Sequence, residues 1–285
     1  MNIIGLDVGF SQHRPSSGVA HLNGSRLTLH HTTSNWSDRK RILGSIDPVD
    51  VAALDAPIVP DSEHGQRDVE RLLSFGIFQR RCKPGASHVR GTGQALRQAG
   101  RKTADQLATV TPEQPLPTEF PRARKSTNIV EAFPNAFLGV CADDSAYAVM
   151  PKLRRGKKFD WLYDAWCRDG LFPRIAAFLG IHGAGVLDAC HRNDHHDERA
   201  ALVCLLTAAC VATGKYVAVG EKLGGYIFLP TWQLWSGWAR CEVDCQRQRL
   251  PWLDVWIDGR SYIPKETFPN ILSRSGATAP YAPRS

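Results

Sequence analysis

Short apolar runs near the start of the chain alternate with polar residues in the way that β-strands do. Three of these runs predict strands: residues 2–7, 17–23 and 25–31. The Asn23-Gly24 pair between the last two strands is typical of a tight hairpin turn. A fourth apolar run, 49–54, predicts a strand that Pro57 ends soon afterwards. The first fifth of the chain is therefore expected to form a small sheet that contains a hairpin.

Helical patterns follow the first strands. Residues 36–45 predict a short helix, with Ser34 or Asn35 as its N-cap. Residues 135–180 are expected to be mainly helical. The apolar, alanine-rich run that begins at Ala200 predicts a buried helix, because acidic residues of the kind that favour a first helical turn come directly before it. The run 224–230 predicts a last strand, so strands and helices alternate as in an α/β fold.

Composition changes along the chain and suggests its organisation. Residues 1–230 are expected to form the main domain, and 58–126 an insertion rich in Arg, Gln, Gly and Pro. Two short helices are expected in that insertion, at 66–75 and 92–108. Residues 231–271 form a Trp-rich C-terminal extension that is expected to pack on the main domain and to contain a hairpin between 253 and 263. The Ser-, Ala- and Pro-rich segment 272–285 is expected to be a flexible tail.

The net charge of +7 is concentrated in several basic runs. The strongest of them supplies five cations: Lys152, Arg154, Arg155, Lys157 and Lys158. Such a run suits a polyanion, and nucleic acid is the expected partner, although a solvated basic surface would look the same in sequence. No apolar stretch reaches the roughly 18 residues that a membrane span needs. Because no secretory leader is evident either, we expect a cytoplasmic protein with no membrane partner.

Cysteine and histidine carry less information. The eight cysteines are scattered and contain no Cys-x-x-Cys pair, which argues against a disulfide framework and a structural zinc site. Cys190 and His191 lie close in sequence to His195 and His196, which could suggest zinc ligands. Adjacent histidines at the start of a helix point in different directions, so we favour a solvated loop beside the site. A histidine in that loop could assist proton transfer or contact phosphate.

Four acidic residues occupy equivalent positions. Asp7, Asp55 and Glu131 end predicted strands, and Asp197 lies in the first turn of the predicted buried helix. Strand ends and a helix N-terminus can converge on one crevice of an α/β sheet, where several carboxylates need cations to neutralise them. Oxygen ligands alone favour Mg²⁺ or Mn²⁺. The pattern therefore predicts two-metal phosphodiester hydrolysis, with these four acids as catalytic residues and Glu198 as a further metal ligand.

Each acid also has a structural alternative. Asp7 could form a turn before Gly9, and Asp55 could cap a turn before Pro57. Glu131 could pair with an arginine from the insertion. Asp197 could simply cap its helix and interact with the helix dipole.

Several of these segments also resemble a known family, the predicted ribonuclease H-like nucleases of the domain-of-unknown-function 429 group. The matching segments run in family order: Gly5-Leu-Asp-Val-Gly-Phe-Ser11, Pro15-Ser-Ser-Gly-Val-Ala20, Ala53-Leu-Asp-Ala-Pro57, Val130-Glu-Ala-Phe-Pro134 with Leu138-Gly139, Arg154-Arg-Gly-Lys-Lys-Phe-Asp160, His196-Asp-Glu-Arg-Ala-Ala-Leu-Val-Cys204 with Leu206-Thr-Ala208, and Gly225-Tyr-Ile-Phe-Leu-Pro230. They cover about residues 1–230.

The resemblance implies a ribonuclease H-like fold, in which a mixed central sheet begins with antiparallel strands, continues with parallel ones and is flanked by helices. It implies two divalent metals bound by acids on the first and fourth strands and the last helix. These acids would be Asp7, Asp55 and Asp197, with Glu131 as a further candidate. One departure matters: the family commonly has Asp-Ala-Leu where this chain has Ala200-Ala201-Leu202.

The leading hypothesis is therefore a divalent-metal-dependent nuclease. The alternative is a catalytically inactive ribonuclease H-like protein that binds nucleic acid or regulates, which the missing acid at Ala200 favours. A sugar-kinase-like or actin-like ATPase would need a second Asp-x-Gly phosphate loop in mid-chain, and the sequence has none.

Overall fold

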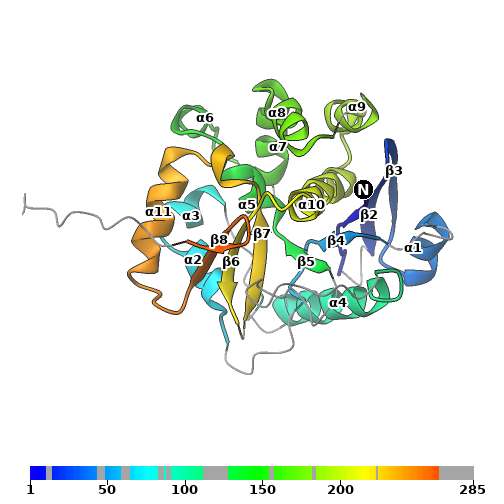
Figure 1. The fold of residues 1–285 in the computed structure, drawn as a ribbon, viewed down its shortest axis with the longest axis horizontal. Helices are drawn as coiled ribbons and strands as arrows, with labels where there is room; N and C mark the ends of the chain where they lie inside the picture. The colour runs from blue at the N-terminus through cyan, green and yellow to red at the C-terminus, as the bar shows by residue number, and fades with distance from the viewer. Residues whose placement is uncertain are drawn as a thin grey trace, which may run out of the picture.

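The computed structural model describes residues 1–10, 15–43, 49–58, 65–82, 87, 91–111, 128–153, 157–181, 184–222 and 224–262. Within these residues one mixed sheet of nine strands runs through the molecule in the order β3-β2-β1-β4-β5-β7-β6-β8-β9 (Figure 1). The strands are β1 (Asn2–Leu6), β2 (Ser16–Asn23), β3 (Arg26–Thr33), β4 (Val51–Leu54), β5 (Ile129–Ala132), β6 (Val217–Glu221), β7 (Gly225–Leu229), β8 (Asp254–Ile257) and β9 (Arg260–Ser261).

Strand directions divide the sheet into three parts. β1, β2 and β3 are antiparallel neighbours, and the hairpin between β2 and β3 turns at Asn23 and Gly24 as predicted. β1, β4, β5 and β7 are parallel neighbours and form the centre of the sheet. β6 runs antiparallel to both β7 and β8. The expected α/β fold, with a mixed sheet of parallel and antiparallel strands flanked by helices, is confirmed.

Helices cover the sheet and fill the connections between strands. They are α1 (Trp36–Leu43), α2 (Asp68–Ser74), α3 (Gly76–Arg81), α4 (Thr92–Leu107), α5 (Pro134–Gly139), α6 (Asp144–Ala148), α7 (Lys158–Arg168), α8 (Leu171–Leu179), α9 (Ala184–Arg192), α10 (His196–Ala212) and α11 (Gly237–Arg247), with a 3-10 turn at Trp232–Leu234. In Figure 1, α10 lies on one side of the sheet and α4 on the other. None of the helices in the described part of the chain is long and apolar enough to cross a membrane.

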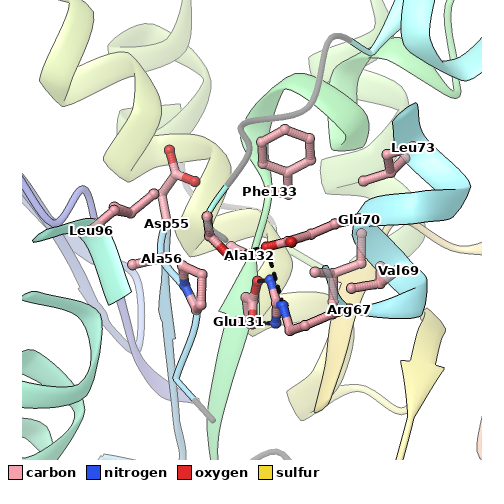
Figure 2. Close-up of a pocket in the computed structure, with 13 residues that line it drawn as sticks. Asp55, Ala56, Arg67, Val69, Glu70, Leu73, Leu96, Glu131, Ala132 and Phe133 are labelled. Atoms are coloured by element: carbon pink, nitrogen blue, oxygen red, sulfur yellow. Dashed lines mark hydrogen bonds and ion pairs between the residues drawn. The ribbon is translucent and has the colours of Figure 1, made fainter. Parts of the chain in front are cut away.

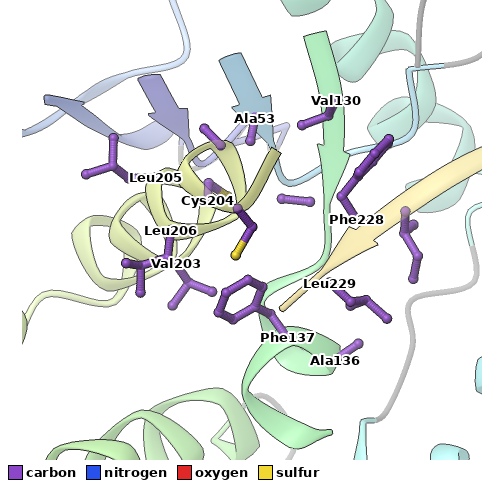
Figure 3. Packing of buried hydrophobic residues seen from close by; sticks show 14 of the residues in the cluster. Ala53, Val130, Ala136, Phe137, Val203, Cys204, Leu205, Leu206, Phe228 and Leu229 are labelled. Atoms are coloured by element: carbon purple, nitrogen blue, oxygen red, sulfur yellow. The ribbon is translucent and has the colours of Figure 1, made fainter. Parts of the chain in front are cut away.

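The central helix α10 is apolar on nearly every side and lies in the middle of the core. Its residues 200–210 are all buried. Figure 3 shows its side chains, Cys204 among them, between the strands and the side chain of Phe137 from α5. A helix that is apolar all round is stable only when it is covered on all sides. The predicted buried helix is therefore present, with its acidic residues in the first turn.

Several elements were not expected from the sequence, among them α3, α9, β6 and α11. β6 (Val217–Glu221) precedes the strand predicted as the last one, and it follows α10 after only a short turn. α11 occupies much of the Trp-rich extension. The predicted hairpin within 253–263 is present as β8 and β9, and β8 pairs with β6, so this extension continues the main sheet. The predicted tail 272–285 lies outside the described residues.

Candidate metal centre at the ends of β1 and β4

Asp7 and Asp55 leave the sheet side by side. Asp7 is the first residue after β1, and Asp55 is the first residue after β4. The two strands are parallel with Leu6 opposite Leu54, and the Asp55 amide donates to the Leu6 carbonyl at 3.0 Å. Because the strands end in register, both aspartates lie at the same edge of the sheet. Both residues are half-buried.

Two glycines bring the third carboxylate to this edge. A Cβ at Gly5 of β1 would overlap the backbone nitrogen of Leu205, and a Cβ at Gly18 of β2 would overlap the carbonyl oxygen of Asp197. Because both positions lack a side chain, α10 packs with its backbone directly against the two strands. This close approach places the first turn of α10, which contains Asp197, over the end of β1.

The charges of these carboxylates are coupled. Desolvation by the surrounding protein raises the pKa of Asp7 well above its usual value of 3.8, and the negative charges of Asp55 and Asp197 raise it further. The pKa of Asp55 is raised to about 7, first by desolvation and then by the charge of Glu131. The charges of Asp55 and Asp197 thus disfavour the ionised form of Asp7, an effect that a bound cation would reverse.

One buried arginine opposes this effect. Arg39 of α1 is 1% exposed, and its guanidinium donates to the Ser17 hydroxyl at 3.0 and 3.3 Å and to the Thr103 hydroxyl at 3.2 Å. The Ser17 hydroxyl in turn donates to the backbone carbonyl of Asp7. The positive charge of Arg39 lowers the pKa of Asp7, but this effect is smaller than that of burial and of the two neighbouring aspartates. Desolvation also lowers the pKa of Arg39 itself, to about 10.

Glu131 forms a different kind of contact. It lies within β5, opposite Leu54 of β4, and its two carboxylate oxygens each accept a hydrogen bond of 2.8 Å from Arg67 (Figure 2). Arg67 also donates to Glu70 at 3.3 Å and to the carbonyl of Gly224 at 3.1 Å. This is the pairing with an arginine from the insertion that the sequence left as an alternative. Both oxygens of Glu131 are therefore engaged by protein.

The Arg67–Glu131 pair lines a small cavity that Asp55 also borders. Its remaining walls are largely apolar and include Leu73 and Phe133 (Figure 2). The cavity holds about 50 Å³. Ligand pockets usually measure several hundred Å³, so this space suits a few water molecules and not a nucleotide. Any nucleic acid would have to approach the aspartates from the open edge of the sheet.

Glu198, the other predicted ligand in α10, is bound to the loop before the helix. The carboxylate of Glu198 accepts a hydrogen bond of 2.5 Å from the side-chain amide of Asn193, in the loop before the helix. Asp197, and not Glu198, is the first-turn carboxylate whose charge acts on Asp7.

A histidine that the sequence did not single out lies beside Asp197. Nε2 of His31, on β3, is 3.4 Å from Oδ2 of Asp197. The ring of His195 is stacked at an angle against that of His31, with 4.0 Å between their centres. Among the residues that the structure describes, these three form the one group of three or more potential ligands whose donor atoms lie within 4.8 Å of one another. Asp7, Asp55 and Asp197 are spread more widely than that, as ligands of two separate ions can be.

The basic run lies next to the start of α10. Asp160 accepts from Lys157 at 3.1 Å and contacts Nδ1 of His196, the first residue of α10, at 2.8 Å. Lys158 donates to the carbonyl of Arg80, and Lys152 is exposed. Two further predicted contacts, Arg154 and Arg155, lie outside the described residues. Through Asp160, Lys157 thus lies near the first residue of the helix that contains Asp197.

Comparison of the chain with family models, curated proteins and solved structures found no match. Three aspartates with oxygen donors only, two of them hard to ionise without a cation, fit hard divalent ions such as Mg²⁺ or Mn²⁺. The histidines beside Asp197 add donors that such ions do not prefer.

Proposed function

We propose that the chain is a divalent-metal-dependent nuclease with a ribonuclease H-like architecture. The observation that carries the proposal is the placement of Asp7 and Asp55 at the ends of neighbouring parallel strands, with the charge of Asp197 acting on Asp7 from the first turn of α10. An antiparallel start, parallel central strands and acids at these three positions are what the ribonuclease H-like resemblance implies.

Each proposed ligand has a defined task. Asp7 lies between the other two in charge coupling, so we assign it as the carboxylate shared by two metals. Asp55 and Asp197 complete the site on either side. Two divalent ions held there would stabilise the charge that develops during phosphodiester hydrolysis. We leave Glu131 out of the ligand set because Arg67 engages both of its oxygens. Its role would be to hold the end of β5 in place beside Asp55.

The substrate surface follows from charge. Lys157 donates to Asp160, which in turn contacts His196, the first residue of α10. A phosphate that contacts Lys157 would lie near Asp197. We propose nucleic acid as the substrate because a net charge of +7 attracts a polyanion and Lys157 lies near the helix start that carries Asp197, so that a phosphodiester held there would be close to a carboxylate.

The test is cleavage of labelled single- and double-stranded DNA and RNA in the presence of Mg²⁺ or Mn²⁺, with chelator as the blank. Wild type should cleave at least one of these substrates, and Asp7→Asn and Asp55→Asn should reduce the rate by at least about 100-fold. Asp188→Asn, at a 62% exposed position of α9, is the matched control and should retain wild-type activity. Metal-dependent cleavage that survives in Asp7→Asn would refute the assignment.

A second candidate function rests on Ala200. This residue is 4% exposed and lies one turn after Asp197, where the family that the chain resembles commonly has an acid. If Asp197 does not replace that acid, the protein would bind nucleic acid without cutting it. Salt-dependent binding by wild type that Lys152→Ala and Lys157→Ala weaken, with no cleavage under either metal, would favour this function.

A further inference from the structure

The group at the junction of β3 and α10 differs in chemistry from the aspartate centre. It joins two imidazoles, from His31 and His195, to the carboxylate of Asp197, with donor atoms within 4.8 Å of one another. Imidazole nitrogens are preferred by zinc and other first-row transition metals, whereas Mg²⁺ takes oxygens. The two kinds of donor therefore select different cations.

The distance between His31 and Asp197 can be compared with those expected for a hydrogen bond and for two ligands of one metal ion. At 3.4 Å, Nε2 and Oδ2 are farther apart than in a good charge-assisted hydrogen bond, which measures about 2.7–2.9 Å. Ligands of tetrahedral zinc lie about 2.0–2.2 Å from the metal, so two of them are separated by about 3.4 Å. An octahedral ion with similar bond lengths would hold neighbouring ligands about 3.0 Å apart. The distance fits the edge of a tetrahedral site.

The backbone holds these ligands in place before any ion binds. Gly18 of β2 is opposite His31 of β3, and the same Gly18 lies directly under the carbonyl of Asp197. The glycine thus brings the strand and the helix start together at this point. On the other side, the amide of His195 donates to the side chain of Asn193 at 2.8 Å, and Arg199 donates to the carbonyl of Asn193 at 2.7 Å. The loop that presents His195 is therefore fixed from both ends.

The group formed by His31, His195 and Asp197 is open to solvent. His31 is 44% exposed and Asp197 is 16% exposed, so a metal ion can enter from solvent and keep a water molecule as its fourth ligand. A carboxylate has two oxygens, so Asp197 can bind one ion through Oδ2, which faces His31, while its other oxygen serves the aspartate centre.

We propose that His31, His195 and Asp197 form a binding site for a zinc-like transition-metal ion, which shares only Asp197 with the aspartate centre. This site does not rest on the proposed nuclease function, because its ligand set and its test require no nucleic acid.

The test is a titration of the metal-free, tag-free full chain with Co²⁺, followed by visible absorption, and then with Zn²⁺ as competitor. Co²⁺ in a tetrahedral site gives strong visible bands that octahedral Co²⁺ lacks. Wild type should bind one ion with these bands, and Zn²⁺ should displace it, as the order of metal affinities predicts. His31→Ala and His195→Ala should each weaken binding at least about tenfold, the low end of what loss of even an outer partner costs a metal site.

The matched control is His30→Ala. His30 is exposed and precedes His31 on β3, so its side chain points to the opposite face of the strand. This variant should bind Co²⁺ and Zn²⁺ as wild type does. Circular dichroism should be unchanged in all variants, since the substituted histidines are at the surface. Wild-type titrations without tetrahedral bands, or affinities equal to wild type in both His31→Ala and His195→Ala, would overturn the proposal.

Discussion

Two sets of carboxylates lie next to each other at the same edge of the sheet, and the protein treats them differently. Glu131 is buried and receives both hydrogen bonds of the Arg67 guanidinium fork. Asp7 and Asp55 are partly exposed. Burial raises the pKa of each, and neighbouring negative charges raise it further: those of Asp55 and Asp197 for Asp7, and that of Glu131 for Asp55. The one arginine whose charge lowers the pKa of Asp7, Arg39, has a smaller effect than the groups that raise it.

The difference shows which charges the chain neutralises by itself. A buried carboxylate with an arginine beside it is a completed structural unit, whereas partly exposed carboxylates that repel one another are stabilised by a cation from solution. We therefore assign a structural role to the Arg67–Glu131 pair and a metal-binding role to the aspartates. Four predictions test this assignment, in order of expected effect.

The largest effect is expected when the completed pair is broken. Arg67→Ala should lower the free energy of unfolding by about 3–5 kcal/mol, because it leaves the charge of Glu131 buried without its partner. Urea unfolding followed by circular dichroism measures this change. Arg192→Ala, which removes an 82% exposed arginine that is 3.9 Å from Asp188, is the control and should cost less than about 1 kcal/mol. If Arg67→Ala also lowered the free energy of unfolding by less than about 1 kcal/mol, the Arg67–Glu131 pair would have no structural role that sets Glu131 apart from the aspartates.

The second prediction concerns pH. Asp55 ionises less readily in the folded protein, where its pKa is about 7, than in the unfolded chain, where it is near 3.8. Its contribution to stability is thus fully present below about pH 3.8, falls as the pH rises and is lost above about pH 7.

Asp55→Asn cannot ionise and should escape this loss. In the absence of metal it should match wild type near pH 4 and be more stable at pH 8 by at most about 4 kcal/mol, and by less to the extent that water reaches the carboxylate. Urea unfolding at both pH values measures the difference. Equal stability of the two proteins at pH 8 would show that the ionised form of Asp55 does not destabilise the folded protein.

The third prediction concerns metal. Mn²⁺ at about 100 times its dissociation constant should stabilise wild type by about 2.7 kcal/mol, since the folded state alone assembles the site. Asp7→Asn should lose most of this gain, and Asp188→Asn should keep it. Thermal unfolding with and without Mn²⁺ measures the shift. If Asp7→Asn gained as much as wild type, the ion would be bound elsewhere.

The smallest effect is expected at Arg39. Replacing this arginine by methionine removes the charge that competes with a cation near Asp7, and Mn²⁺ should then bind about fivefold more tightly, equivalent to roughly 1 kcal/mol. Arg41→Met, on the same helix but 77% exposed, should leave the affinity unchanged. Calorimetric titration compares the two variants. Weaker binding in Arg39→Met would mean that Arg39 supports the site.

The sequence predicted the placement of the aspartates because that information is local. An apolar run followed by Asp7 and Gly9 marks the end of a strand, and Asp197 before an apolar stretch marks the start of a helix. These positions agree with the structure. Of the five predicted nucleic-acid contacts in the basic run, Arg154 and Arg155 lie outside the described residues.

What the sequence could not predict depends on contacts between distant segments. Arg67 and Glu131 are 64 residues apart, so nothing in either segment identifies the partner. His31 reaches Asp197 only through the register of β2 with β3 and the close packing of α10 on Gly18. β6 was missed because its apolar residues follow those of α10 after a short turn.

The most direct test of the central claim is the position of bound metal. Crystals of the full chain soaked in Mn²⁺ should give anomalous difference peaks at the edge of the sheet, in contact with the carboxylates of Asp7 and Asp55 and with one peak shared with Asp197. Asp7→Asn crystals should lack these peaks. A wild-type map at saturating Mn²⁺ with no peak beside Asp7 would contradict the claim that these aspartates form a metal centre.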